Sequence, residues 1–255
     1  MSKYPIFVLA WLVLSLGLLA ETASASETLR RGEFEHDVSL KDLLGEDFSA
    51  EISNVFDGKD KITWSLYVPK DYSPANPPGI FVFVSPISDG TIRTKWKRAF
   101  DAHNMIYISA NGAGNYVPSK RRFYHSVLAL STVQKLYETD DRVRIISGFS
   151  GGGRMSTRIL ELLPGTFSGG LIIGGAYDWI GTDQALAQTL EGGAYVFLTG
   201  DMDHAEWETR RAYLQYKNAG VADLKYMSVR GLTHRFPGWK EMDKALAFLG
   251  ERLRD

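Results

Sequence analysis

The chain has 255 residues, with 29 Lys and Arg against 30 Asp and Glu, so its formal net charge is −1. This near-neutral balance gives no indication of a nucleic-acid or anionic-membrane partner. The sequence contains no cysteine, which excludes disulfides and an anchor attached through a lipidated cysteine.

The first 25 residues have the pattern of a secretory signal peptide. Lys3 precedes an apolar run over Ile6–Ala20, and Ala23-Ser24-Ala25 has the small-x-small form of a cleavage site. A transmembrane anchor is the alternative, but the run is a little shorter than the ~20 residues that a span needs. We therefore expect removal of residues 1–25 and a secreted or periplasmic location. The remaining chain of about 230 residues is long enough for one α/β domain with its own core.

The segment after the cleavage site begins with few structural signals. Residues 26–50 are polar and weakly patterned, and we expect a lead-in without an assigned function before a catalytic domain over residues 51–255. Ile52–Phe56 and Ile62–Val68 are extended runs, and the Asp57-Gly58-Lys59-Asp60 segment between them is a turn signal. They predict an antiparallel hairpin at the edge of the sheet.

Strands and helices are then predicted to alternate. The first of these strands, Gly79–Val84, is apolar on every side, which is typical of a central strand covered by helices on both faces. Later strands are predicted over Met105–Ser109, Leu171–Ile173, Tyr195–Leu198 and Leu224–Val229, and helices over Ile92–His103, Arg122–Tyr137, Ala205–Asn218 and Trp239–Leu249. This alternation predicts a doubly wound, mostly parallel α/β sheet.

The stretch from Val143 to Met155 combines a buried strand, a serine and a helix start. Its β-branched beginning predicts the strand, and apolar residues at helical spacing after Ser150 predict the helix. Gly148 and Gly152 flank the serine in a G-x-S-x-G pattern, and a serine on a tight strand-to-helix turn needs such small neighbours. A phosphate-binding loop is the alternative, but G-x-G-x-x-G and a G-K-[ST] ending are missing. The pattern predicts a nucleophile elbow with Ser150 as nucleophile.

Such a serine needs a base to remove its proton and a carboxylate to orient that base. In elbow proteins these partners follow in the order Ser, Asp or Glu, His, on loops at the carboxyl ends of strands. Only two of the five histidines come after Ser150. His234 directly follows the predicted strand that ends at Val229, and we expect it to be the base rather than an ordinary loop histidine. His204 lies beside an acid at a predicted helix start, and we interpret it as a surface residue.

Three aspartates are candidates for the acid. Asp201 and Asp203 both lie in the loop after Leu198, and Asp178 lies in the loop after the preceding strand. Asp203 also forms a capping-box pattern with Glu206 for the next helix, although capping and catalysis are not exclusive. Only position on the loops separates the three candidates, and it favours Asp203.

The oxyanion of an acyl-transfer reaction requires two backbone donors. One is the residue after the nucleophile, Gly151. The other should come from the loop after the first buried strand, where Pro86 has no N–H. This leaves Ser85, Ile87 and Ser88, of which Ile87 is favoured.

These segments resemble a known family. The stretch Asp141–Met155, Gly200-x-x-Asp203 and Gly231-x-x-His234 are similar to those of α/β-hydrolases, most closely the secreted esterases grouped with polyhydroxybutyrate depolymerases and feruloyl esterases. The resemblance covers roughly residues 62–249. It implies the α/β-hydrolase fold, with Ser150, Asp203 and His234 as nucleophile, acid and base.

Other parts of the chain agree with that group or depart from it. Members tend to have an Asn-rich loop and paired arginines before the helix that leads to the elbow strand, similar to Asn111–Asn115 and Arg121-Arg122. Many superfamily members have His-Gly where this chain has Ser85-Pro86, which affects the second oxyanion donor. The missing cysteines are a departure from members that carry disulfides.

Together these features predict a secreted serine esterase that works through an acyl-enzyme. Only about twenty residues separate Ile173 from Tyr195, too few for a helical cap, so we expect an open site and an ester substrate that is bulky, polymeric or on a cell surface. Four aromatic residues near the loops are candidates for lining an acyl or aryl pocket, although packing in the core or at the rim is the favoured role for any one of them; they are Tyr116, Tyr177, Trp179 and Trp239.

The alternatives differ in chemistry. A serine peptidase on the same fold attacks amides with the same geometry, and a non-catalytic binding protein keeps the fold without turnover. No metal or organic cofactor is expected, because H-E-x-x-H is missing and Asp201 with Asp203 supplies too few ligands. We also expect no nucleic-acid partner and no stable membrane anchor after signal removal.

Overall fold

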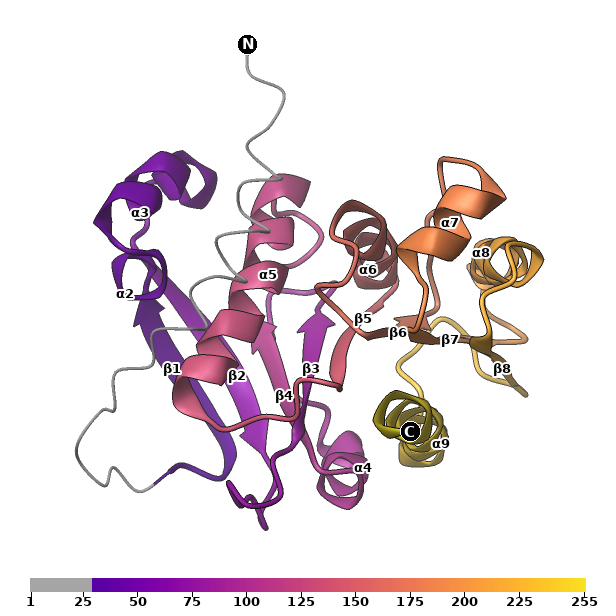
Figure 1. The fold of residues 1–255 in the computed structure, drawn as a ribbon, viewed down its shortest axis with the longest axis horizontal. Coiled ribbons are helices and arrows are strands. Elements are labelled where there is room, and N and C mark those ends of the chain that lie inside the picture. The colour runs from indigo at the N-terminus through magenta and orange to yellow at the C-terminus, as the bar shows by residue number, and fades with distance from the viewer. Residues whose placement is uncertain (1–28) are drawn as a thin grey trace.

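The computed structural model describes residues 29–255, so the predicted signal peptide lies outside the described residues. Eight strands form a single sheet in the order β1-β2-β4-β3-β5-β6-β7-β8 (Figure 1). Strands β1, β2 and β4 pair antiparallel, and all the other neighbouring pairs are parallel. The predicted doubly wound, mostly parallel sheet is confirmed.

The strands are β1 (Gly32–Ser39), β2 (Lys61–Val68), β3 (Gly79–Val84), β4 (Met105–Ala110), β5 (Arg144–Phe149), β6 (Gly169–Ile173), β7 (Ala194–Gly200) and β8 (Asp223–Val229). The α-helices are α2 (Leu40–Leu44), α3 (Glu46–Ile52), α4 (Lys97–Ala102), α5 (Ser119–Leu136), α6 (Gly151–Leu162), α7 (Asp183–Thr189), α8 (Glu206–Asn218) and α9 (Trp239–Arg254). Two short 3₁₀ turns, η2 (Ser53–Phe56) and η3 (Thr94–Trp96), precede β2 and α4.

Helices cover both faces of the sheet, which explains why its central strands are apolar on every side. Helices α4 and α9 lie on one face, and α5, α6, α7 and α8 lie on the other (Figure 1). In β3, Ile80 and Val82 belong to the hydrophobic cluster under α5, whereas Phe81 and Phe83 belong to the cluster under α4 and α9. Successive side chains of a strand point to opposite faces, so both sets are buried.

The predicted hairpin has the wrong first arm. Residues 46–56 form α3 and η2 rather than a strand, and β2 pairs instead with β1, with Phe34 opposite Leu66. The reason is that β1 is an edge strand whose side chains alternate between half-buried and exposed, and its acidic residues conceal that period. Ile52 and Phe56 are buried, as the strand prediction assumed, but they pack from a helix.

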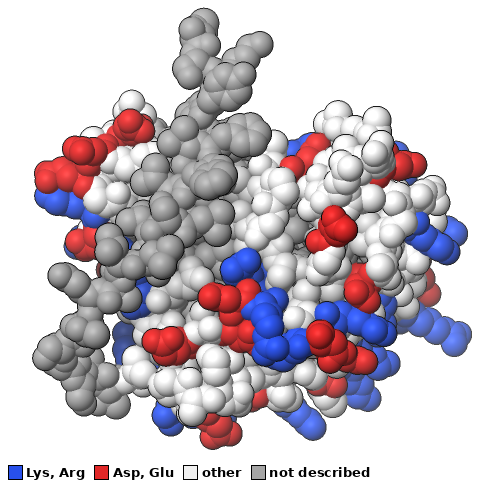
Figure 2. Space-filling model, in the orientation of Figure 1, with Lys and Arg blue, Asp and Glu red and all other residues white. Residues whose placement is uncertain are grey.

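The described part of the chain contains no large cap. The segment between β6 and β7 holds only α7, a short helix that the prediction missed. Within residues 29–255, no helix combines the length and apolar character needed to cross a membrane. On the face shown in Figure 2, basic and acidic side chains are interspersed, which agrees with the near-neutral net charge.

The turn from β5 into α6 is held by close backbone packing. Ser150 has φ 55°, a conformation that residues other than glycine rarely adopt, and its N–H donates to the Ile173 carbonyl at 2.9 Å. A methyl group at Gly152 would overlap the carbonyl oxygen of Val84, and one at Gly148 would overlap the backbone of Gly152. Glycine is therefore required at both positions so that the elbow can approach β3.

We expect Gly152→Ala to lower the free energy of unfolding by at least about 2 kcal/mol, because the backbone of β3 cannot move aside for the new methyl group. Gly250→Ala in α9 is the matched control. Its methyl group would meet only Arg254 Nη1, at 2.8 Å, at the end of a flexible side chain. That variant should unfold at the same or slightly higher denaturant concentration, since alanine favours helix. Similar denaturation midpoints for both variants would contradict this account.

Candidate active site

Ser150, Asp203 and His234 come from three different loops at the carboxyl edge of the sheet. Ser150 follows β5, Asp203 follows β7 and His234 follows β8. Because the parallel strands run in the same direction, their outgoing loops meet at one edge. Sequence positions 84 and 31 residues apart are thereby brought into contact.

The three side chains form a continuous hydrogen-bonded chain. His234 Nε2 lies 2.9 Å from Ser150 Oγ, and His234 Nδ1 lies 2.7 Å from Asp203 Oδ1. With its proton on Nδ1, the imidazole donates to the carboxylate and accepts from the serine hydroxyl. The Asp203 side chain is only 2 % exposed, and the His234 side chain is 23 % exposed. The arrangement can remove the serine proton without moving any of the three groups.

The other two candidate acids make different contacts. Asp201 Oδ1 accepts from the backbone N–H of Gly231 at 2.6 Å and so ties the β7 loop to the β8 loop. Asp178 is paired with Arg211, at 2.7 Å from Oδ1 to Nε. Of the three predicted aspartates, the structure brings Asp203 to His234.

The predicted capping box around Asp203 is wrong. Helix α8 begins at Glu206, and Asp203 Oδ1 accepts from the N–H of Ala205, not from that of Glu206. The Glu206 carboxylate accepts instead from the Tyr226 hydroxyl at 2.8 Å. The carboxylate of Asp203 turns towards the imidazole, so a local capping pattern gives way to a long-range contact.

The predicted oxyanion donors lie on loops that pack against each other. Gly151 is the first residue of α6, where backbone N–H groups lack intrahelical acceptors. The Ile87 N–H donates to Ser85 Oγ at 3.2 Å, a long contact within its own loop. The Asn115 N–H donates to the Pro86 carbonyl at 2.9 Å. The Asn115 side chain packs against Gly151, where it occupies the space that a methyl group would need. The Asn-rich loop after β4 therefore supports both segments.

Arg122 is a buried cation beneath these loops, and the sequence did not predict its contacts. Its guanidinium donates to three backbone carbonyls, which are those of Ala113 at 3.1 Å, Ser85 at 3.1 Å and Gly151 at 3.4 Å. Burial lowers the pKa of Arg122 from its usual range. Burial, together with Arg121 and Arg122, also lowers the pKa of the neighbouring His125 to about 4, so that imidazole is neutral at pH 7. One side chain thus joins the loops that carry both predicted donors.

The four aromatic residues expected near the loops have different surroundings. Tyr116 and Tyr177 are exposed, on the loops after β4 and β6. Trp179 packs against the core, and the ring of Trp239 lies under the guanidinium of Arg98, with 4.4 Å from Cζ to the ring centroid. Of these four aromatic residues, only the two tyrosines are exposed at the carboxyl edge of the sheet.

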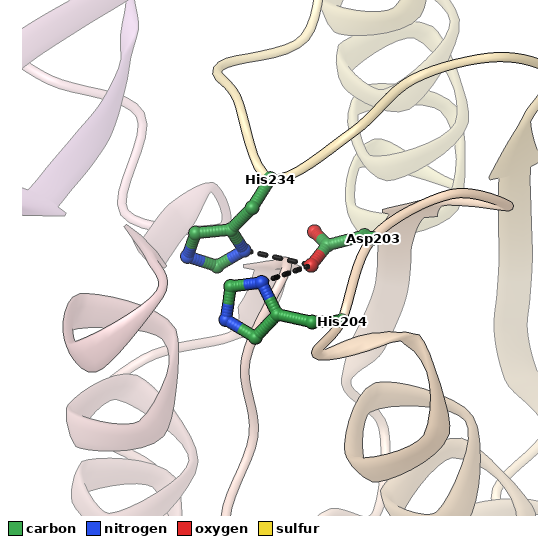
Figure 3. Close-up of side chains that lie close together, drawn as sticks. All are labelled: Asp203, His204 and His234. Carbon is green, nitrogen blue, oxygen red and sulfur yellow. Dashed lines mark hydrogen bonds and ion pairs between the residues drawn. The ribbon is translucent and has the colours of Figure 1, made fainter.

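His204 lies closer to the site than the sequence indicated. Its ring centroid is 4.1 Å from that of His234, and its Nδ1 is 3.9 Å from Asp203 Oδ1 (Figure 3). The side chain is 74 % exposed, so the prediction of a surface residue holds, but it adds a second imidazole beside the carboxylate. The sequence places His204 directly after Asp203, but that adjacency alone did not predict the contact.

Comparison with known proteins rests on structure alone. No family model and no curated protein matches the sequence. The thermostable carboxylesterase EstE1 from a metagenomic library has a TM-score of 0.63, with 11 % identity over all of both chains. A serine-to-alanine mutant of the feruloyl esterase module from Clostridium thermocellum, complexed with sinapinate, has a TM-score of 0.61 and 12 % identity over 89 % of this chain and 91 % of that one.

A peptidase is also among the similar structures. A putative dipeptidyl aminopeptidase IV from Bacteroides ovatus has a TM-score of 0.60 and 15 % identity, over 91 % of this chain but 38 % of that one. At these identities the similarity establishes architecture and not activity. The fold expected from the resemblance to secreted esterases is therefore confirmed: this chain has the α/β-hydrolase fold.

Proposed function

We propose that this protein is a secreted serine hydrolase that cleaves carboxylic esters through an acyl-enzyme intermediate. The observation that carries the proposal is the hydrogen-bonded chain from Ser150 through His234 to Asp203, built on a strained elbow. The similarity of the fold to a carboxylesterase and a feruloyl esterase module supports ester chemistry.

In the first step, Ser150 Oγ attacks the ester carbonyl carbon while His234 Nε2 takes the hydroxyl proton. The imidazolium then protonates the leaving alcohol as the C–O bond breaks. In the second step, His234 removes a proton from water, which attacks the acyl-enzyme. The imidazolium then returns that proton to Ser150 Oγ as the C–O bond breaks, which releases the acid and restores the free serine. Asp203 holds the imidazole in its working tautomer and stabilises the imidazolium in both steps.

The negative oxygen that forms in each step would be stabilised by the N–H groups of Gly151 and Ile87. The Ile87 N–H must then exchange Ser85 Oγ for the oxyanion, which its 3.2 Å contact allows at small cost. Arg122 acts here as a positioning residue, because its guanidinium holds the carbonyls of Ser85 and Gly151 and so fixes the backbone of both donor segments.

The surface around Ser150 favours a substrate with apolar parts. Among the described residues, several of the large exposed hydrophobic side chains lie on loops at the carboxyl edge or on the first turn of α8; they are Ile87, Tyr116, Tyr177, Ile180, Met202 and Trp207. Since only α7 stands between β6 and β7, a bulky or polymer-borne ester has open access. A secreted or periplasmic location, as predicted from the signal-peptide pattern of residues 1–25, suits such a substrate.

A serine peptidase on the same fold is the second candidate, because a putative dipeptidyl aminopeptidase is among the structural neighbours. A panel of p-nitrophenyl esters and aminoacyl p-nitroanilides separates the two. We expect kcat/KM to be higher for the esters. Faster hydrolysis of the anilides would favour the peptidase.

Replacing the nucleophile tests for catalysis as such. We expect Ser150→Ala to lower kcat for p-nitrophenyl acetate by at least about 10³-fold and to abolish covalent labelling by a fluorophosphonate probe. A folded wild-type protein that neither labels nor hydrolyses any ester would support a non-catalytic binding protein instead.

Two aspartates in one loop provide a matched test of the acid. Asp203→Asn should lower kcat by about 10⁴-fold, because an amide at this position favours the wrong tautomer of His234. Asp201→Asn keeps an oxygen acceptor for the Gly231 N–H and should lower kcat by less than about tenfold. Steady-state kinetics on both variants, with circular dichroism to check folding, measure the difference. The reverse ranking would assign the acid to Asp201.

Adjacent arginines provide a matched test of loop positioning. Arg122→Lys leaves a single ammonium where a guanidinium bonded to three carbonyls, so we expect kcat to fall at least about tenfold with little change in KM. Arg121, which pairs with Asp57 and the Val55 carbonyl, is the control, and Arg121→Lys should leave kcat within about twofold. An equal loss of kcat in both variants would indicate a general structural role.

A further inference from the structure

The second histidine completes a set of metal-binding atoms at the predicted triad. One ligand atom from each of Asp203, His204 and His234 lies within 4.8 Å of the other two. Within residues 29–255, this is the one group of three or more His, Cys, Asp or Glu side chains spaced in this way. His204 projects from the loop between β7 and α8 towards the same carboxylate oxygen that bonds His234 (Figure 3).

The spacing fits a small divalent ion. Zn²⁺ binds imidazole nitrogen and carboxylate oxygen at about 2.0–2.2 Å, so tetrahedral ligand atoms lie roughly 3.3 Å apart. The distances to Asp203 Oδ1 are 2.7 Å from His234 Nδ1 and 3.9 Å from His204 Nδ1, one below and one above that value. A shift of well under 1 Å at each imidazole would equalise them.

The donor set and its exposure select the kind of ion. Two imidazoles and one carboxylate suit Zn²⁺, Cu²⁺ or Ni²⁺, whereas Mg²⁺ and Ca²⁺ prefer six or more oxygen ligands. Asp203 is shielded from solvent, but the side chain of His204 is 74 % exposed, so a hydrated ion has access from that side. Three protein ligands leave a fourth position for water.

We propose that Asp203, His204 and His234 form an inhibitory site for a divalent transition metal such as Zn²⁺. This proposal rests on the proposed function, and it concerns inhibition rather than a cofactor. The ion takes the place of the proton between His234 Nδ1 and Asp203 Oδ1. That proton passes to solvent, and the neutral imidazole takes up another at Nε2, so the net charge of the ring is unchanged.

The consequence for the reaction is direct. An imidazole that coordinates the ion through Nδ1 and carries its proton on Nε2 has no lone pair for the Ser150 hydroxyl. The base is therefore blocked while Ser150 itself remains in place. His204 supplies a metal ligand but is not part of the hydrogen-bonded chain from Ser150 through His234 to Asp203. A substitution of His204 can therefore weaken metal binding while the hydrogen-bonded chain stays complete.

The test titrates ZnCl₂ into the purified, chelator-treated protein and follows binding by calorimetry and p-nitrophenyl acetate hydrolysis in parallel. We expect one equivalent to bind, with inhibition over the same concentration range and none with MgCl₂. His204→Ala and His204→Gln should each weaken Zn²⁺ binding at least about tenfold and raise the inhibitory concentration equally, relative to their own activity in chelator. Thermal melts verify that both variants fold.

Two control variants distinguish metal binding at this site from the proposed esterase activity. His103→Ala removes a histidine that pairs with Asp243 at 2.9 Å but belongs to no group of three ligand side chains within residues 29–255, and it should not change Zn²⁺ binding. Ser150→Ala should still bind Zn²⁺, because the serine is not a ligand. Binding that depends on His204 in a protein without esterase activity would support the metal site and refute the proposed function. Wild-type protein that binds no Zn²⁺, or His204 variants that bind it as tightly as wild type, would overturn the proposal.

Discussion

The close approach of the β5–α6 turn to its neighbours is the constraint on which the rest of the site depends. Ser150 is held at positive φ because Gly152 packs under the Val84 carbonyl and the Ser150 N–H bonds to Ile173. The elbow is thus fixed to β3 on one side and to β6 on the other. A strained residue persists only where its surroundings over-determine it, and here two strands do so.

The polar groups beneath the site follow from the same packing. Loops from β3, β4 and β5 come together around Arg122, whose guanidinium donates to one backbone carbonyl in each of these three segments. The buried imidazole of His125 stays neutral beside it, so it adds no positive charge to that of Arg122. A fixed, buried cation favours negative charge near it, and the proposed attack on an ester creates such a charge.

The sequence was sufficient where the signal was local or periodic. The G-x-S-x-G pattern located the turn at Ser150, and the order of loops led to Asp203 and His234. The sequence was insufficient where the structure of a segment depends on contacts with distant parts of the chain. The edge strand β1, the helix at residues 46–52 and the bond from Asp203 to the Ala205 N–H depend on partners far along the chain or on the final loop geometry. Arg122 and His204 were visible as residue types, but nothing local predicted what they touch.

Strand β8 forms the outer edge of the sheet and hydrogen-bonds to β7 alone. It carries His234, whereas Ser150 leaves a strand with neighbours on both sides. Edge segments open at a lower free energy than the centre of a domain. Detachment of this edge would withdraw the imidazole and leave the serine turn intact, so partial unfolding would break the hydrogen-bonded chain to Ser150 before the core itself is lost.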